Sequence, residues 1–159
     1  MKKFKNCTLK EYLDVLARKE PVPGGGSALA LAGALGAGLL SMVTQYSIGR
    51  KHSSAVERRL KKNLKQSETI RQRLTELVDL DAQAYWKVVK ARRGSAQDKK
   101  KAAKAAAAVP REIGRLCFQA VQLAPFLVQN GNKYLIGDVI AAVEILSGAF
   151  HSSRAFTGE

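Results

Sequence analysis

Residues 21–43 read PVPGGGSALALAGALGAGLLSMV, a turn rich in proline and glycine followed by an uncharged apolar segment. The strictly apolar part is about 16 residues long, which is below the roughly 20 that a bilayer-spanning helix requires. Small residues recur within it at close spacing, and they allow two helix backbones to approach closely: Ala30, Gly33, Ala34, Ala37 and Gly38. The segment therefore predicts a helix over 28–43, capped by Ser27, that lies in a protein core or a dimer interface rather than in a membrane.

Helical patterns lie on both sides of this segment. Before it, Thr8 and Glu11 form a capping-box pattern that starts a helix running to about Lys19. After it, apolar spacing and helix-forming composition predict helices over 54–92, over 99–108, from Pro110 to about Pro125, and over 137–153. The inner face of the last helix is predicted at Val139, Ile140, Val143, Leu146 and Phe150. No alternating strand pattern of useful length occurs. We therefore expect one all-α domain, 1–159, built as an antiparallel bundle of about five to six helices.

Composition limits the classes of protein that the chain can belong to. Its 159 residues are 46% apolar, as in an ordinary globular domain, and carry a net charge of +14. Cys7 and Cys117 match no metal or disulfide spacing, and no apolar stretch directly follows the basic start, so a cytoplasmic protein without a signal peptide or metal is expected. The positive field favours anionic ligands. The basic segments 58–62 and 99–101 lack interleaved aromatic residues and are typical of solvated helix faces, so nucleic acid is not the expected partner.

The helix predicted over 54–92 turns one carboxylate inward. At about 100° per residue, Asp81 falls about 20° from Leu74, in the middle of the apolar stripe, whereas Asp79 falls about 140° away on the face predicted to be solvated. A buried carboxylate needs a partner, a proton or a polar cleft. Asp81 is therefore either a general acid/base with a raised pKa or one half of a buried salt bridge, with Arg115 or Lys87 as the candidate partner.

Two further positions carry weaker signals. Gly24, Gly25 and Gly26 lead directly into a helix N-terminus, where free backbone N–H groups and the helix dipole favour an anion. The alternative is a tight turn with Ser27 as the helix cap. Asp138 begins the last predicted helix, where Asp is also a favoured N-cap.

Together these motifs resemble the cyclodeaminase domain of the formiminotransferase-cyclodeaminase family, which includes methenyltetrahydrofolate cyclohydrolases. Four ordered segments carry the resemblance: 21–27 followed by 41–43, 78–85, 109–110, and 131–132 leading to 137–139. The resemblance implies an all-helical homodimer that binds tetrahydrofolate, which can carry a polyglutamate tail, without a tightly bound cofactor. It also implies that Asp81 is catalytic and that the following residues bind substrate: Pro23, Gly24, Gly25, Gly26, Ser27, Asn132 and Asp138.

The chain also departs from the family pattern. It is about a dozen residues shorter between Ala91 and Val109, has Gly137 where the family has serine, and lacks the family's Asn-Val motif near its C-terminal end, which makes the domain short there. The expected activity is cyclisation of 5-formiminotetrahydrofolate to 5,10-methenyltetrahydrofolate with release of ammonia. The alternatives are a methenyltetrahydrofolate cyclohydrolase, or a non-catalytic folate-binding or scaffold member of the family. A basic RNA-binding helical protein is the rival outside the family.

Overall fold

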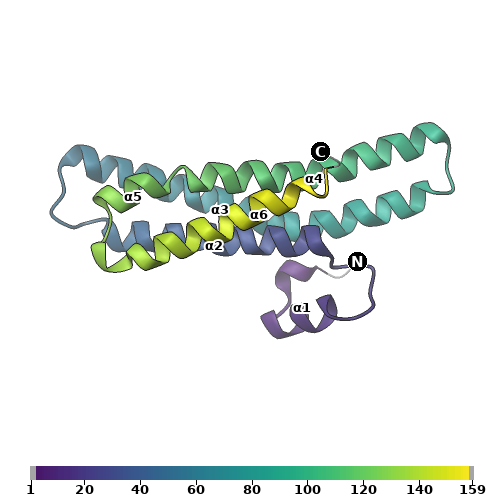
Figure 1. Ribbon diagram of the computed structural model, residues 1–159, viewed down its shortest axis with the longest axis horizontal. Helices are drawn as coiled ribbons and strands as arrows, with labels where there is room; N and C mark the ends of the chain where they lie inside the picture. Colours follow the sequence, from purple (N-terminus) through teal and green to yellow (C-terminus); the bar gives the residue numbers. More distant parts are fainter. Residues whose placement is uncertain (1–2, 158–159) are drawn as a thin grey trace.

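Four long helices form the body of the protein in a computed structural model, which describes residues 3–157 (Figure 1). They are α2 (Gly25–Ser47), α3 (Ser54–Ala91), α4 (Ala96–Val121) and α6 (Ile136–Arg154). Successive long helices run in opposite directions, and α2 and α4 each pack against both α3 and α6. Shorter elements complete the fold: η1 (Phe4–Asn6), α1 (Leu9–Leu16), α5 (Ala124–Asn130) and η2 (Lys133–Leu135). The predicted all-α antiparallel bundle is confirmed.

Helix α2 is the central helix because its small residues allow neighbours on several sides. Ala30, Ala37 and Leu40 are fully buried. A Cβ added at Gly36 would lie 2.6 Å from Cγ of Leu146 in α6, so glycine permits that close approach. By length and composition α2 could cross a membrane, as could the segment Lys133–Arg154, but 56% of the apolar window of α2 is buried inside the protein. The prediction of a core helix is confirmed.

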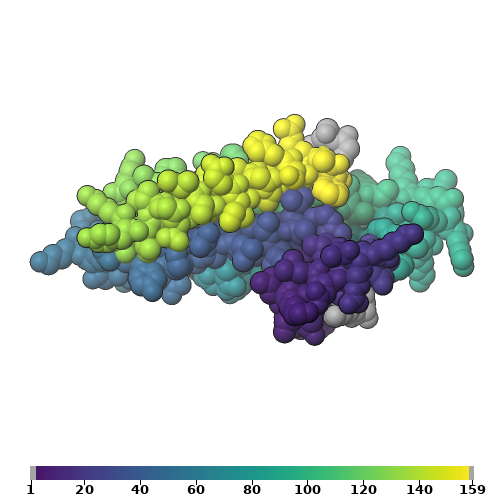
Figure 2. Space-filling model, turned by 60° about the horizontal axis from the view of Figure 1, so that its bottom comes forward, coloured from purple at the N-terminus to yellow at the C-terminus, as the bar shows by residue number. Residues whose placement is uncertain are grey.

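Helices α3 and α4 extend beyond the other two. Their hairpin projects past the residues where α2 begins and α6 ends (Figure 1), and in the space-filling view its tip extends further than the N-terminal segment that covers one side of the bundle (Figure 2). A regular row of buried residues packs the long helix α3 against the core, and it includes Leu60, Leu74 and Leu77. The difference in helix length leaves a step at one end of the bundle, and this step forms the site described below.

Three predictions about the helices were wrong. Pro110 does not begin a helix but lies inside the continuous α4, where its ring is buried and the loss of one backbone hydrogen bond is tolerated within an alanine-rich helix. Ser27 is not an N-cap, because α2 starts two residues earlier with Gly24 as its cap. Ile140 is 57% exposed, because the smaller Ala142, together with Val139, occupies the inner face of α6.

The N-terminal segment packs beside α3. The predicted capping box is present: the Glu11 backbone N–H donates to Thr8 Oγ1 at 3.2 Å, and the Thr8 N–H donates to Glu11 Oε2 at 2.9 Å. The prediction that Asp79 is solvated was wrong. This residue is 5% exposed, because the turn η1 covers it and the Lys5 backbone N–H donates to Asp79 Oδ1 at 3.3 Å. Helical periodicity correctly placed Asp79 on a different face of α3 from Asp81. It could not show that the N-terminal turn η1 covers that face.

Candidate active site

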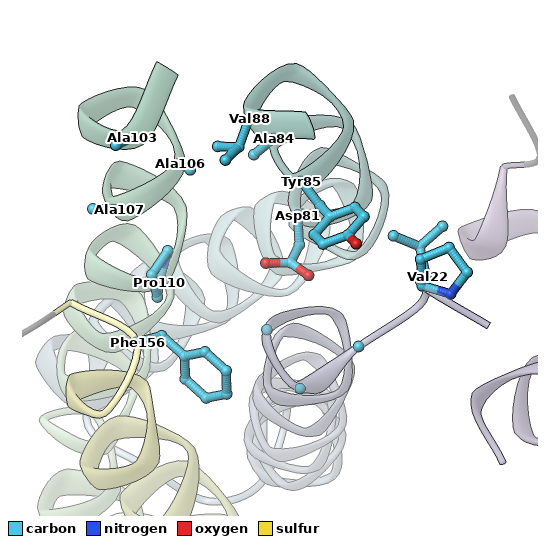
Figure 3. A pocket seen from close by; sticks show the side chains of 14 residues that line it. Val22, Asp81, Ala84, Tyr85, Val88, Ala103, Ala106, Ala107, Pro110 and Phe156 are labelled. Atoms are coloured by element: carbon cyan, nitrogen blue, oxygen red, sulfur yellow. The ribbon is translucent and has the colours of Figure 1, made fainter. Parts of the chain in front are cut away.

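A pocket of about 430 Å³ lies at the step where α2 begins and α6 ends (Figure 3). The start of α2 forms its floor, α3 and α4 form its walls, and the turn after α6 contributes Phe156. Most of the lining is apolar, and alanines of α4 keep the space open, namely Ala103, Ala106 and Ala107. In the described part of the chain, Asp81 is the single charged side chain that lines this pocket. The pocket therefore suits a flat apolar or heteroaromatic group with one polar reacting centre.

Asp81 projects from α3 into the middle of this pocket, above the N-terminus of α2 (Figure 3). Its Oδ2 accepts a hydrogen bond from the Ser27 backbone N–H at 3.0 Å. That N–H belongs to the first turn of α2, which has no intrahelical acceptor for it, so the carboxylate satisfies a free donor of the helix. The second carboxylate oxygen, Oδ1, has no hydrogen bond within residues 3–157 and is available to a ligand.

The glycines at the start of α2 allow the carboxylate to come this close. A Cβ at Gly26 would overlap Oδ1 of Asp81, so no residue with a side chain fits there without moving the carboxylate. Gly25 lies under the Phe156 ring, whose Cζ would be 2.6 Å from an added Cβ. Gly24 has open space around it and lines the pocket. The glycine loop and Asp81, which are far apart in sequence, thus line the same pocket.

Ser27 supports the site from below rather than lining it. It is fully buried, and its hydroxyl oxygen lies 3.0 Å from the Tyr12 hydroxyl oxygen, with which it forms a hydrogen bond. Burial raises the pKa of Tyr12 above its ordinary value, so this hydroxyl keeps its proton. Pro23, which follows a cis peptide bond, is also buried and does not line the pocket. Of the predicted substrate-binding residues in this loop, only Gly24, Gly25 and Gly26 face the cavity.

The surroundings of Asp81 make its carboxylate a better proton acceptor than an ordinary aspartate. Burial raises the pKa of its carboxyl above the ordinary value, and the hydrogen bond from Ser27 offsets part of that effect. The alternative of a buried salt bridge is excluded for the described residues. Arg115 instead lies 3.9 Å from Glu112, and Lys87 is exposed outside this pocket. Asp81 is therefore a half-buried, unpaired carboxylate beside a cavity.

Two aromatic residues that sequence reasoning did not assign to the site flank the carboxylate. Tyr85, predicted within the apolar stripe, is 39% exposed and lines the pocket one helical turn beyond Asp81. Phe156 lies across the cavity from it (Figure 3). The spacing of Tyr85 from Asp81 could have indicated its place, since residues four apart share a helix face. Nothing in the sequence indicated Phe156, because it lies after the last predicted helix.

Asn132 and Asp138 do not lie with the other predicted site residues in this chain. Asn132 is buried in the turn after α5, where its backbone N–H donates to Ser47 Oγ at 2.9 Å. Asp138 lies in the first turn of α6, while Phe156 follows the opposite end of that helix, roughly 27 Å away at 1.5 Å per residue. Their role in substrate binding stays a prediction from the resemblance.

Comparisons of the sequence and of the structure with known proteins point to the same family. The family model described as formiminotransferase-cyclodeaminase matches residues 8–156. A methenyltetrahydrofolate cyclohydrolase of Methylorubrum extorquens is 37% identical over 152 residues, covering 89% of this chain and 72% of that protein. The formimidoyltransferase-cyclodeaminase of Rattus norvegicus is 26% identical over 91% of this chain, which spans 29% of that longer protein. The crystal structure of formiminotetrahydrofolate cyclodeaminase from Thermotoga maritima superposes with a TM-score of 0.92 and 29% identity, covering 96% of this chain and 77% of that chain.

The contact between Gly26 and Asp81 gives a direct test of the site geometry. Gly26→Ala should lower the free energy of unfolding by about 1–3 kcal/mol, because the added methyl group must displace the carboxylate. Gly38→Ala is the matched control in the same helix. Its Cβ meets only Cδ of Arg71 at 3.6 Å, so it should raise the stability by about 0.5–1 kcal/mol. Urea unfolding measures both, and a Gly26→Ala variant as stable as the parent protein would contradict the described geometry.

Proposed function

This chain belongs to the formiminotransferase-cyclodeaminase family of folate one-carbon enzymes, and we propose that it hydrolyses 5,10-methenyltetrahydrofolate to 10-formyltetrahydrofolate with Asp81 as the general base. The observation that carries the proposal is the carboxylate of Asp81, which has no ion-pair partner among the described residues and lies half-buried in a mostly apolar pocket. Hydrolysis is preferred over ring closure because the relative named as a cyclohydrolase is 37% identical over most of this chain, whereas the relatives named as cyclodeaminases that match over most of the chain are 26–29% identical.

In the proposed reaction, water attacks the carbon that bridges N5 and N10 of the substrate. Asp81 accepts a proton from this water as its oxygen bonds to the carbon, which gives a tetrahedral intermediate. The bond between N5 and that carbon then breaks and Asp81 returns the proton to N5. The hydroxyl group of the intermediate releases its own proton to solvent as it becomes the carbonyl of the formyl group, which stays on N10. One carboxyl group with a pKa raised towards neutrality can serve in both proton transfers, and such catalysis is typically worth about 10²–10⁴-fold.

Tyr85 and Phe156 give the pocket a place for the fused ring of the substrate. Their rings flank the carboxylate from α3 and from the turn after α6 (Figure 3). Aromatic side chains pack well against a flat heteroaromatic group, and the surrounding alanines add apolar wall to the pocket. The net charge of +14 would attract the glutamate carboxylates of a folate, including a polyglutamylated one, from a distance.

Ring closure of 5-formiminotetrahydrofolate is the second candidate, and it is supported by the fold similarity to the Thermotoga maritima cyclodeaminase. In that reaction N10 attacks the formimino carbon, and Asp81 carries the proton from N10 to the departing nitrogen, which leaves as ammonia. Both reactions pass through a tetrahedral carbon between N5 and N10. The same carboxylate can therefore serve either one, and the difference between them is whether water or N10 is the nucleophile.

We further propose that the protein acts in the cytoplasm as a homodimer. Helix α6 is apolar, yet only 22% of its apolar window is buried within one chain. Beside it, an apolar groove of about 350 Å³ runs between α6 and the α4–α5 junction, with Val128 and Ile140 more than half exposed on its two sides. An exposed apolar surface of this kind is typical of a subunit interface.

The dimer can be tested by the mass in solution. Sedimentation equilibrium should give about twice the chain mass of 17.2 kDa. Ile140→Lys, which places a charge in the groove, should shift the protein to the monomer. Leu9→Lys, at an equally exposed apolar position on α1, should remain dimeric. A monomeric parent protein, or a dimer unaffected by Ile140→Lys, would contradict this interface.

Replacement of Asp81 separates catalysis from folding. Asp81→Asn should lower kcat by about 10²–10⁴-fold, because the amide cannot take up a proton. Its stability at neutral pH should be equal or higher, since burial disfavours the charged carboxylate and the amide oxygen can still accept from Ser27. Asp79→Asn, the matched change two residues earlier, should retain activity.

The assay follows methenyl absorbance with each of the two substrates offered separately. Its loss from 5,10-methenyltetrahydrofolate identifies the hydrolase, and its appearance from 5-formiminotetrahydrofolate identifies the cyclodeaminase. Full turnover by Asp81→Asn would exclude the assigned role, and folate binding by the parent protein without turnover of either substrate would identify a non-catalytic member.

The pH dependence of hydrolysis should report the environment of Asp81. The reactive form is the carboxylate, so kcat/KM should fall as the pH falls through the pKa of Asp81. Because burial raises that pKa, the decline should be centred above the ordinary aspartate value of about 4. A profile of kcat/KM against pH measures the midpoint, and a midpoint at or below the ordinary value would mean that another group limits the rate.

A further inference from the structure

A second pocket, of about 460 Å³, lies between the first turns of α3 and the junction of α4 with α5. Three cationic side chains line it, Arg58, Arg59 and Lys62, together with the amides of Gln66 and Gln122, and no acidic side chain from the described residues does. Along α3 its centre near Asn63 is roughly 27 Å from Asp81 at 1.5 Å per residue. It is therefore separate from the proposed folate site, and the function proposed above makes no use of it.

Lys62 lies four residues after Arg58 and three after Arg59, so it shares a side of α3 with each of them. The guanidinium carbon of Arg59 lies 4.5 Å from the centre of the Phe126 ring, a cation–π contact that holds this side chain over the pocket wall. The nearby Glu57 does not neutralise them. Its carboxylate accepts from the Gly49 backbone N–H at 3.2 Å and lies 3.9 Å from the Lys61 ammonium group, on another side of the helix.

Asn63 contributes an unusual polar group to the same pocket. The residue is 5% exposed and lines the pocket, and its Nδ2 has no hydrogen-bond partner. Among the described residues it is the single buried side-chain nitrogen or oxygen atom in this condition. A buried donor without a partner costs about 1–3 kcal/mol, so its presence in a residue of this cationic pocket needs an explanation. An acceptor bound in the pocket provides one.

We propose that this pocket binds a multiply charged oxyanion, carried on a phosphate or a polycarboxylate. The guanidinium groups of Arg58 and Arg59 suit two-pronged hydrogen bonds to such oxygens, and Lys62 adds a third charge. The Asn63 amide supplies a neutral donor. The basic segment 58–62 is then not merely a solvated helix face, because one side of it forms a ligand site.

Calorimetric titration of the full chain with inorganic pyrophosphate and with citrate, at about 0.15 M salt, tests this site. At least one anion should bind saturably at one site per chain. Arg58→Gln and Lys62→Gln should each raise its Kd about tenfold or more, since each removes a charged contact. Lys65→Gln is the matched control, because it removes the same charge from an exposed residue of α3 outside the pocket. Tighter binding of pyrophosphate indicates a phosphate-bearing ligand, and tighter binding of citrate indicates a polycarboxylate.

Asn63→Asp should abolish binding, because it replaces the donor with a negatively charged acceptor, and thermal unfolding shows whether that variant folds. If it does not fold, the comparison of Arg58→Gln and Lys62→Gln with Lys65→Gln decides the question. The proposal is overturned if neither anion binds, or if Lys65→Gln weakens binding as much as the pocket variants do. Asp81→Asn should leave anion binding unchanged, so failure of the folate proposal does not affect this result.

Discussion

The hydrogen bond from the Ser27 backbone N–H to the Asp81 carboxylate holds the candidate site together. It joins the first turn of α2 to the C-terminal third of α3, and it satisfies a helix donor that the N-cap residue Gly24, which has no side chain, cannot cap. The contact requires glycine at position 26, where any side chain would occupy the place of the carboxylate. On its other side, Ser27 is fixed by Tyr12 of α1. The backbone, and not a charged partner, therefore sets the position of the reactive group.

The pocket around this contact follows from the unequal lengths of the helices. Because α3 and α4 continue past the start of α2 and the end of α6, their facing surfaces have no covering helix at that end (Figure 1). The exposed walls are apolar, and α4 presents small residues to the cavity. A carboxylate in such a place loses hydration without gaining a counter-ion, which raises its pKa. Architecture and chemistry are thus connected, since the step that makes room for a ligand also makes Asp81 a better base.

The sequence predicted those features that depend on local signals. The capping box of α1, the length of α3 and the inward direction of Asp81 all follow from spacing within one helix. Features that depend on distant segments were missed. Asp79 is covered by the N-terminal turn, more than seventy residues away in sequence, and Phe156 reaches the pocket only because α6 ends beside the start of α2. The prediction that a helix begins at Pro110 failed because tertiary packing stabilises the continuous helix around it and outweighs the missing hydrogen bond.

The distribution of positive charge agrees with the proposed role of Asp81 as a general base. A cation within about 4–6 Å of a carboxylate favours its charged form and lowers its pKa, which weakens it as a base. The chain has 27 lysine and arginine residues, yet none of those within residues 3–157 lines the pocket of Asp81. They lie instead on other surfaces, including the basic face of α3 at residues 58–62 and the side of α4 that carries Lys101, Lys104 and Arg115. Those surfaces can attract an anionic substrate through the long-range field. Exclusion of cations from the pocket itself preserves the raised pKa that the proposed proton transfers require.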